Sequence, residues 1–300
     1  MRFVHCSDIH LLDLAGTWPH ELMNKRVTGA LNLLLKRRKR HDDGQFEAIL
    51  SALEGLEVDR LVITGDVTNL SLASEFRKVA RVLASCPVPV TVIPGNHDAY
   101  VGSAYRAGLF ATHLGDHMPP GDGDSGDATF PFVERAHDGI ALIGVDTAVP
   151  TPPLIATGEV GAAQLGRLRT ILRTCREEGR VRVVLMHHPP AEGASKPKHD
   201  LLDRAAFAEV IRDEGADVIL HGHEHREMVT SLPGPDGPVP IYGVPSGTSV
   251  DLRPGREGGF ALFELQPGRG SRVRYVPGTD GFVPADEGTT WVLERPADAG

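Results

Sequence analysis

Arg-Leu-Val-Ile-Thr-Gly-Asp, residues 60–66, combines an apolar run with a glycine and an aspartate, a combination that recurs in this 300-residue chain. Its short apolar run, rich in Val and Ile, is typical of a strand buried on both faces. The glycine allows a sharp turn, which leaves the Asp66 carboxylate at the carboxyl end of that strand. The segment therefore predicts a buried strand that ends in a chemically useful residue, although an aspartate in this position is equally often part of a plain turn.

The same pattern recurs along the chain. Strand-like runs occupy 2–6, 60–63, 88–93, 140–145, 181–186 and 217–221, and helix-like stretches occupy 45–55, 72–84, 160–176 and 203–213. Alternation of this kind indicates βαβ units packed in layers. From about residue 226 the sequence changes to short runs punctuated by glycine and proline, which predicts antiparallel hairpins. We expect one domain over 1–300, in which these hairpins complete a second sheet.

Composition excludes several classes of protein. The chain is 41% hydrophobic and 24% charged, which is ordinary for a globular enzyme with one large core. Its net charge of −9 argues against dedicated nucleic-acid binding, which needs a basic surface.

Cys6, Cys86 and Cys175 form no metal-type or redox-type pair. No apolar run reaches the ~18 residues of a membrane span, and the first residues do not read as a signal peptide. We therefore expect a cytoplasmic protein.

Four further segments place metal-binding residue types after predicted strands. They are Asp8-Ile9-His10, Gly95-Asn96-His97-Asp98, His187-His188 and Gly222-His223-Glu224-His225. Taken singly, most of these have a simpler explanation, because an Asp-x-His is usually a surface loop and a lone histidine after a strand is usually structural. Five such strand-end sites in one chain, Asp66 included, are very improbable by accident. The sequence therefore predicts one metal centre built from all five.

The donor types indicate the metals and the chemistry. Carboxylate, amide and imidazole ligands without thiolate suit manganese, iron or zinc. This many donors would over-supply one ion, whereas two ions fit. A shared carboxylate could hold two ions ~3.5–4 Å apart, the spacing at which a hydroxide is activated and phosphoryl oxygens are clamped. Hydrolysis of a phosphate ester is the reaction that this arrangement matches best.

In this order the five segments resemble the calcineurin-like metallophosphoesterase superfamily, over residues 2 to about 226. The resemblance implies an α/β fold, namely a four-layer α/β/β/α sandwich of two mixed β-sheets with a dinuclear site at the carboxyl ends of the strands. It also implies the metal ligands: Asp8, His10 and His225 for one ion, Asn96, His187 and His223 for the other, and Asp66 as the bridge. His97 would orient the phosphate and protonate the leaving group.

The residues after Asp66 argue against two branches of the superfamily. Purple acid phosphatases have a metal-binding tyrosine where this chain has Asn69. Protein serine/threonine phosphatases continue with Val-Asp-Arg-Gly and have a glutamate in place of Asp98. What remains resembles bacterial phosphodiesterases of the cyclic-nucleotide and glycerophosphodiester type. The resemblance implies that a hydroxide bridging two metal ions, Mn²⁺ or Fe²⁺ and otherwise Zn²⁺, attacks a small phosphodiester such as a cyclic nucleotide.

Two alternatives stay open from the sequence. An apolar stretch followed by the basic run 36–40 suggests peripheral membrane contact through 31–40, and with it hydrolysis of a pyrophosphate-linked lipid precursor. A helix with a solvated basic end explains the same residues and is the favoured interpretation. Some members of the superfamily have instead become non-catalytic scaffolds. All eight site positions carry suitable side chains here, so a scaffold is the least favoured alternative.

Substrate contacts are less determined than metal ligands. The loop 189–200 carries Lys196 and Lys198, which would reach a substrate phosphate or simply lie exposed. His188 lies beside the site, and Tyr100 would stack on a base or cap the following helix. His5, His41, His199 and His221 are weaker candidates. The sequence leaves the physiological substrate and the oligomeric state open.

Overall fold

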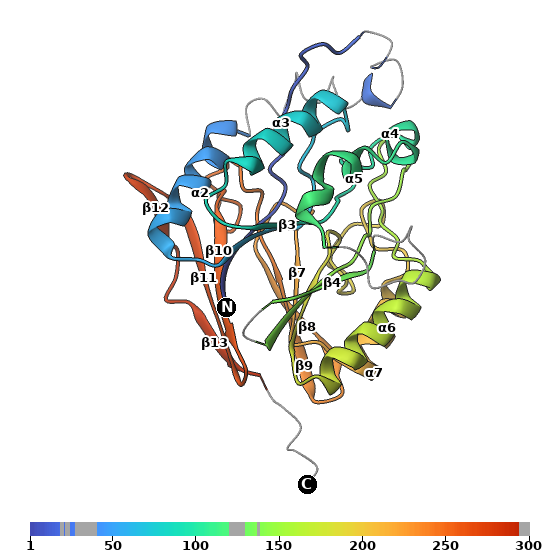
Figure 1. The fold of residues 1–300 in the computed structure, drawn as a ribbon, viewed down its shortest axis with the longest axis vertical. Coiled ribbons are helices and arrows are strands. Elements are labelled where there is room, and N and C mark those ends of the chain that lie inside the picture. Colours follow the sequence, from blue (N-terminus) through green and yellow to red (C-terminus); the bar gives the residue numbers. More distant parts are fainter. Residues whose placement is uncertain (19–20, 22–24, 28–40, 120–129, 137–138, 294–300) are drawn as a thin grey trace.

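A computed structural model describes residues 1–18, 21, 25–27, 41–119, 130–136 and 139–293. Two β-sheets face each other, and helices cover the outer face of each, which gives four layers in the order α/β/β/α (Figure 1). The predicted fold class is confirmed. The apolar–basic segment 31–40 lies outside the described residues. Within them, no helix is long and apolar enough to cross a membrane.

The first sheet combines parallel strands from the start of the chain with antiparallel strands from its end. Its order is β12-β11-β10-β1-β2-β3, and β13 also pairs with β11. The bounds are β1 (Arg2–Cys6), β2 (Arg60–Ile63), β3 (Val90–Val92), β10 (Phe260–Gln266), β11 (Arg269–Gly278), β12 (Gly281–Pro284) and β13 (Thr289–Val292). β1, β2 and β3 run parallel, connected through α2 (Asp43–Leu56) and α3 (Ala73–Ala84). These crossovers bring the carboxyl ends of the three strands to one edge of the sheet.

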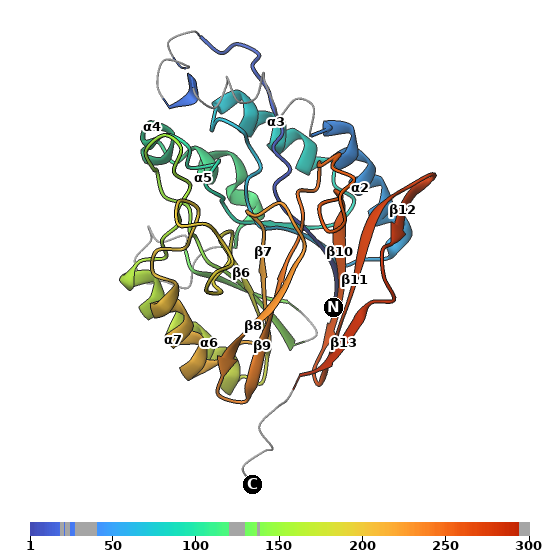
Figure 2. The same cartoon turned by 180° about the vertical axis from the view of Figure 1, so that it is seen from behind.

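The second sheet has the order β4-β5-β6-β7-β9-β8. Its strands are β4 (Phe132–Arg135), β5 (Ile140–Gly144), β6 (Val181–Leu185), β7 (Val218–His221), β8 (Met228–Gly234) and β9 (Gly237–Gly243). β5, β6, β7 and β9 run parallel, and β4 and β8 are antiparallel strands at the two edges. Figure 2 shows α6 (Ala162–Glu177) and α7 (Arg204–Glu214) side by side on the outer face of this sheet.

Strand β6 shows why the apolar runs of the sequence are continuous rather than alternating. Val183 and Leu185 point into the core between the two sheets, whereas Val184 and Met186 point into a second core beneath α6 and α7. All four side chains are buried. Because both faces are covered here, the four consecutive residues from Val183 to Met186 are all apolar, as the sequence pattern predicted.

The structure corrects the prediction for the strands after residue 226. Only β8 and β9 complete the second sheet, whereas β10 to β13 extend the first sheet. β10 pairs antiparallel with β1, with Phe263 opposite Phe3 and their rings stacked at 5.4 Å. The apolar strand β10 thereby covers an edge of β1 that would otherwise expose unpaired backbone groups.

Candidate metal centre

The structure brings all seven predicted metal ligands to the carboxyl ends of the parallel strands. Asp8 and His10 follow β1, Asp66 follows β2, Asn96 follows β3, His187 follows β6, and His223 and His225 follow β7. Both sheets therefore contribute to one cluster between them. The side chains divide into two groups of potential ligand atoms, which we call site 1 and site 2.

Site 1 comprises Asp8, His10, Asp66 and His225, whose ligand atoms lie within 4.8 Å of one another. The Nε2 atoms of His10 and His225 are 3.2 Å apart. Asp8 Oδ1 is 3.1 Å from His225 Nε2, and Asp66 Oδ2 is 3.8 Å from His10 Nε2. Donors about 2.1 Å from one ion lie roughly 3.0–3.4 Å apart, so this convergence suits a divalent cation.

One oxygen of site 1 is weakly satisfied by the protein itself. Asp8 Oδ1 is buried and, within the described part of the chain, has no hydrogen bond of good geometry, although His225 Nε2 lies 3.1 Å away. A buried carboxylate oxygen needs a hydrogen-bond donor or a cation, and a divalent ion would serve as the cation. The residues of site 1 therefore fit a bound divalent ion.

Site 2 comprises Asp66, Asn96, His187 and His223. Asn96 Oδ1 lies 3.2 Å from His187 Nε2 and 2.9 Å from His223 Nδ1. Asp66 Oδ1 lies 3.5 Å from His187 Nε2. Asp66 thus presents Oδ1 to site 2 and Oδ2 to site 1, which is the arrangement of a carboxylate shared by two ions.

Backbone carbonyls determine which ring nitrogen carries the hydrogen in three of the four ligand histidines. Thr68 O accepts from His10 Nδ1 at 3.2 Å, Thr64 O accepts from His187 Nδ1 at 2.7 Å, and His199 O accepts from His223 Nε2 at 2.9 Å. A carbonyl oxygen can only accept, so the hydrogen lies on the nitrogen that faces it. The other nitrogen then presents its lone pair to the centre, as metal ligation requires.

In this cluster the charges of Asp66 and His187 shift each other's pKa toward the ionised form. Burial alone would lower the pKa of His187, but the charge and hydrogen bond of Asp66, together with Asp8, outweigh it and raise that pKa to about 9. Burial alone would raise the pKa of Asp66, yet His187 and His97 hold it well below its usual range. Asp66 is therefore ionised at neutral pH. A cation would replace the proton of His187 in neutralising this carboxylate.

His97 lies beside the ligands without belonging to either site. Its Nδ1 donates to Asn69 O at 2.6 Å, and its backbone N–H donates to Asp66 Oδ1 at 2.7 Å. Its ring centroid lies 4.9 Å from that of His10. Since Nδ1 is committed to a carbonyl, Nε2 carries a proton only in the imidazolium form. A protonated His97 would thus present an acidic N–H at Nε2.

Asp98 joins the loops that carry Asp66 and His97. Its carboxylate accepts from the backbone N–H groups of Gly95 at 2.9 Å, Val67 at 3.2 Å and Thr68 at 2.9 Å. Burial, followed by the charge of Asp66, raises its pKa to about 7. Asp98 therefore holds the loops of Asp66 and His97 together through these backbone contacts.

The ligand loops have an unusual backbone conformation. Five of the seven ligands have φ angles between 45° and 73°: Asp8, His10, Asp66, His223 and His225. Glycines precede three ligands because the loops touch there. A Cβ at Gly65 would lie 2.7 Å from Gly95 N, and one at Gly222 would overlap Ser7 Oγ and Asp8 Oδ2. The loops are therefore packed as closely as their backbones allow.

Gly95→Ala tests this close packing. The added Cβ would overlap Asp66 Oδ1 and lie 2.8 Å from His187 Cε1, so it must displace the shared carboxylate. We expect an about 10- to 100-fold loss of Mn²⁺-dependent phosphoesterase turnover, which corresponds to roughly 1–3 kcal/mol of overpacking. Gly166→Ala in α6 is the matched control, because nothing lies within 4 Å of its Cβ. Equal turnover by the two variants would show that the loops are looser than described.

The four predicted substrate residues differ in how they are placed. Lys196 and Lys198 are exposed on the loop that leads to His199, whose carbonyl holds His223. His188 is fully buried, and its ring nitrogens bond Thr147 Oγ1 at 2.8 Å and Ala156 O at 3.1 Å. These contacts favour a structural role for His188.

Tyr100 is packed rather than presented to a ligand. Its ring stacks on that of His97 at 5.3 Å and 9°, and Lys25 Nζ lies 4.5 Å from the ring centroid. Lys25 also donates to Thr151 Oγ1 at 2.9 Å, and burial lowers its pKa to about 8. The arrangement favours positioning of His97 over stacking on a substrate base.

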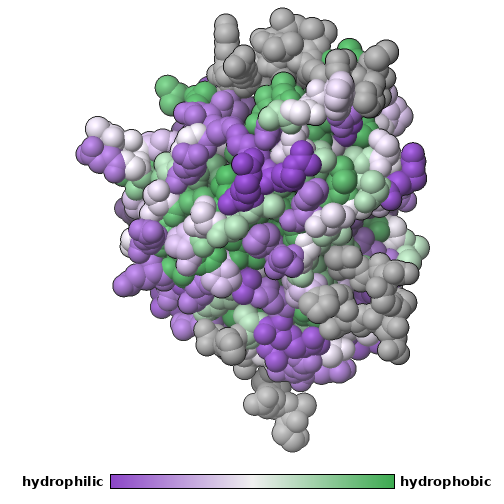
Figure 3. Space-filling view, turned by 45° about the horizontal axis from the view of Figure 1, so that its top comes forward, coloured by the Kyte–Doolittle hydropathy of each residue, from purple (hydrophilic) through white to green (hydrophobic). Residues whose placement is uncertain are grey.

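Lys25 and Arg26, which precede the apolar–basic segment 31–40 in the chain, face the protein. Lys25 packs on Tyr100, and the buried Arg26 donates to Leu70 O at 2.8 Å and Ser71 O at 2.6 Å. Hydrophobic and hydrophilic residues are interspersed on the face that Figure 3 shows. Scattered apolar side chains of this kind are ordinary on a protein surface and do not argue for lipid.

The structure also brings to the site residues whose role no sequence pattern indicates. His41, only a weak candidate, lies with its ring 5.2 Å from that of His10 and 5.6 Å from that of His225. Its Nδ1 is within hydrogen-bond distance of Ser246 and Thr248. The two hydroxyls occur in a loop without metal-type spacing, so only the fold reveals them.

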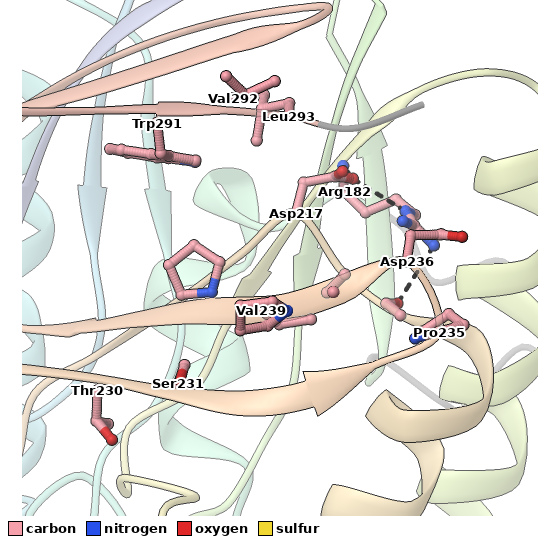
Figure 4. Close-up of a pocket in the computed structure, with 15 residues that line it drawn as sticks. Arg182, Asp217, Thr230, Ser231, Pro235, Asp236, Val239, Trp291, Val292 and Leu293 are labelled. Carbon is pink, nitrogen blue, oxygen red and sulfur yellow. Dashed lines mark hydrogen bonds and ion pairs between the residues drawn. The ribbon is translucent and has the colours of Figure 1, made fainter. Parts of the chain in front are cut away.

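A large cleft of about 500 Å³ lies at the opposite ends of the strands. Figure 4 shows it between the turn at Pro235 and Asp236 and the end of β13 at Trp291, with the Arg182–Asp217 ion pair on one wall. None of the predicted site residues lines it. The metal centre and this cleft are therefore separate features.

Comparisons with known proteins agree with the geometry of the site. A model of the family described as calcineurin-like phosphoesterase matches residues 1–227. The chain is 27% identical over 200 residues to a probable cyclic nucleotide phosphodiesterase of Rhodococcus erythropolis, a match that covers 63% of this chain and 60% of that protein. It is 26% identical over 227 residues to the 3′,5′-cyclic adenosine monophosphate phosphodiesterase CpdA of Vibrio vulnificus, covering 74% and 73%. The match thus spans three fifths of the Rhodococcus relative's length.

Solved structures share the fold at low sequence identity. A dimetal phosphatase from Danio rerio superimposes with a TM-score of 0.67 at 14% identity, covering 98% of this chain and 99% of that one. PhoD superimposes with a TM-score of 0.60 at 12% identity, covering 98% and 70%. At these identities the likeness concerns the fold alone.

Proposed function

Because the chain belongs to the calcineurin-like phosphoesterase family, we propose that it is a metal-dependent hydrolase of a small phosphodiester, such as a cyclic nucleotide. The observation that carries this proposal is the carboxylate of Asp66, whose Oδ2 lies toward His10 of site 1 and whose Oδ1 lies toward His187 of site 2. The names of the Rhodococcus and Vibrio relatives favour a cyclic nucleotide as the substrate. The unpaired Cys6, Cys86 and Cys175 suit a reducing cytoplasm.

Seven residues would hold two divalent ions, with Mn²⁺ or Fe²⁺ preferred and Zn²⁺ as the third candidate. Asp8, His10 and His225 would bind one ion, Asn96, His187 and His223 the other, and Asp66 both. When bound, the ions would supply an acidified water molecule and positive charge for the phosphoryl oxygens.

The chain's own residues would then direct the proton. Attack of water on phosphorus breaks the bond to the leaving oxygen, which needs a hydrogen to depart as an alcohol. His97 would donate this hydrogen from Nε2, while the hydrogen bond from Nδ1 to Asn69 O keeps the ring in place. Lys196 and Lys198, which are exposed, would contact the substrate phosphate, and Tyr100 and His188 would position the residues that they contact.

The proposal is tested by metal removal and a substrate panel. Protein stripped with a chelator should lose at least about 10³-fold in turnover of bis(p-nitrophenyl) phosphate and of 3′,5′-cyclic AMP, and Mn²⁺ should restore both, since the ions contribute several kcal/mol to the transition state. Glycerophosphodiesters, phosphomonoesters and a nucleotide-linked lipid pyrophosphate complete the panel. A metal-loaded protein inert on every compound would point to a scaffold, and turnover of the lipid pyrophosphate alone would point to the membrane alternative.

A further inference from the structure

His41 lies against site 1 without being one of its four ligands. Its ring contacts those of His10 and His225 at 5.2 Å and 5.6 Å, nearly edge-on to each. Among the described residues, His41 falls outside the group whose ligand atoms approach within 4.8 Å. Its influence on a metal ion would therefore pass through other residues.

The partners of His41 define its protonation at Nδ1. Ser246 Oγ donates to Asp8 O at 2.6 Å, and Thr248 Oγ1 donates to Ile9 O at 3.1 Å. A hydroxyl has only one hydrogen, so both oxygens can act only as acceptors toward His41. His41 Nδ1 lies 3.2 Å from Ser246 Oγ and 3.0 Å from Thr248 Oγ1, and it must supply the hydrogen for these contacts.

The two carbonyls at the end of this network belong to the peptide groups that join Asp8 to His10. Both of these ligands have left-handed backbone conformations, with φ angles of 55° and 45°. Residues other than glycine adopt such angles only when surrounding contacts hold them. The hydroxyls of Ser246 and Thr248 hold both intervening carbonyls, and the N–H of His41 orients the hydroxyls.

We propose that His41 is a positioning residue for site 1, which acts by donating its Nδ1 hydrogen to Ser246 and Thr248 and so fixes the Asp8–His10 backbone. This inference rests on the proposed metal centre and goes beyond the proposed reaction. Loss of a residue that holds the metal ligands in place, without binding the metal itself, typically costs about 10- to 100-fold in metal affinity. The loss should be confined to one of the two ions, because no member of site 2 lies on the Asp8–His10 segment.

Two conservative variants separate the roles of the two ring nitrogens. Asparagine places an N–H near the position of Nδ1, whereas glutamine reaches the position of Nε2. Titration of metal-free protein with Mn²⁺, followed by calorimetry and electron paramagnetic resonance, should show two ions bound by wild type. His41→Ala and His41→Gln should weaken one ion about 10- to 100-fold. His41→Asn should recover most of that affinity, and His117→Ala, at the far ends of β2 and β3, should bind like wild type.

The hydroxyls give a second and milder test of the same network. Thr248→Val retains His41 but removes both its acceptor and the donor to Ile9 O, and it should weaken the same ion. Combined with His41→Ala it should add little, because both changes interrupt one network. Circular dichroism of the metal-free variants checks folding, and Thr248→Val keeps the test informative if His41→Ala does not fold.

Two results would overturn the inference. Wild-type affinity for both ions in His41→Ala and Thr248→Val would remove His41 from the centre. Recovery by glutamine but not by asparagine would instead make Nε2 the active atom. The readout is metal affinity, so a wild-type protein that binds two Mn²⁺ ions but cleaves no phosphoester would refute the proposed function while leaving this inference intact.

Discussion

Asp66→Asn should abolish nearly all phosphoesterase activity and reduce the number of tightly bound Mn²⁺ ions from two to at most one. Asparagine tolerates the left-handed backbone of this position, where φ is 54°, so the exchange removes the carboxylate charge with little change of shape. That charge lies between the ligands of site 1 and those of site 2. Loss of several kcal/mol of metal-dependent stabilisation predicts an about 10³- to 10⁴-fold fall in kcat/KM.

The measurement combines metal analysis with turnover of bis(p-nitrophenyl) phosphate. Asp213→Asn is the matched control, since its carboxylate is exposed on α7 and pairs only at the surface with Arg169 and Arg212 among the described residues. This control should retain two ions and full activity. An Asp66→Asn protein that keeps both ions and more than about a tenth of the activity would contradict the role of Asp66 as a shared ligand.

His97→Gln should separate catalysis from metal binding. The histidine belongs to neither ligand set, so the variant should bind two Mn²⁺ ions like wild type. Loss of a positioned general acid predicts an about 10²- to 10⁴-fold fall in kcat. The fall should be smallest for bis(p-nitrophenyl) phosphate, because p-nitrophenolate departs readily without a proton, and larger for diesters with alkoxide leaving groups.

The dependence on the leaving group distinguishes proton donation from mere structural support. His117→Gln, a histidine exchange at the opposite ends of β2 and β3, serves as the control and should match wild type on every substrate. An equal fall in kcat for good and poor leaving groups would show that His97 does not donate the proton. Loss of a metal ion would show instead that its ring supports the ligands.

The sequence predicted the central strands and their crossover helices within two residues at each end. Strands such as β6, buried on both faces, and helices with an apolar stripe carry that signal locally. The short helices α4 (Gly102–Arg106) and α5 (Leu109–Leu114) and the edge strand β4 were not predicted, since four to six residues show no clear period. The prediction that β10 belongs to the second sheet was wrong, because strand pairing depends on contacts between residues far apart in the chain, such as Phe3 and Phe263.

The candidate metal centre likewise has features that the sequence predicts and features that only tertiary contacts determine. The ligand segments could be chosen from the sequence because each couples a strand end to a metal-type side chain. Which oxygen of Asp66 faces which site depends on tertiary contacts such as the backbone N–H of His97. Which nitrogen of His10, His187 and His223 carries the hydrogen depends on carbonyls of Thr68, Thr64 and His199 that no motif marks. The inward packing of Arg26 and the network of His41 likewise arise from tertiary contacts alone.

The left-handed backbone of five ligands limits how this centre could be transplanted. In residues other than glycine that conformation costs about 1–2 kcal/mol each, so five of them cost about 5–10 kcal/mol. A whole domain has a net stability of only about 5–15 kcal/mol. A designer who copied the seven side chains onto another sheet would inherit this cost without the glycine contacts and hydroxyl bonds that offset it here. A design would therefore have to transfer the whole set of contacting loops, because the ligand side chains alone would not form the centre.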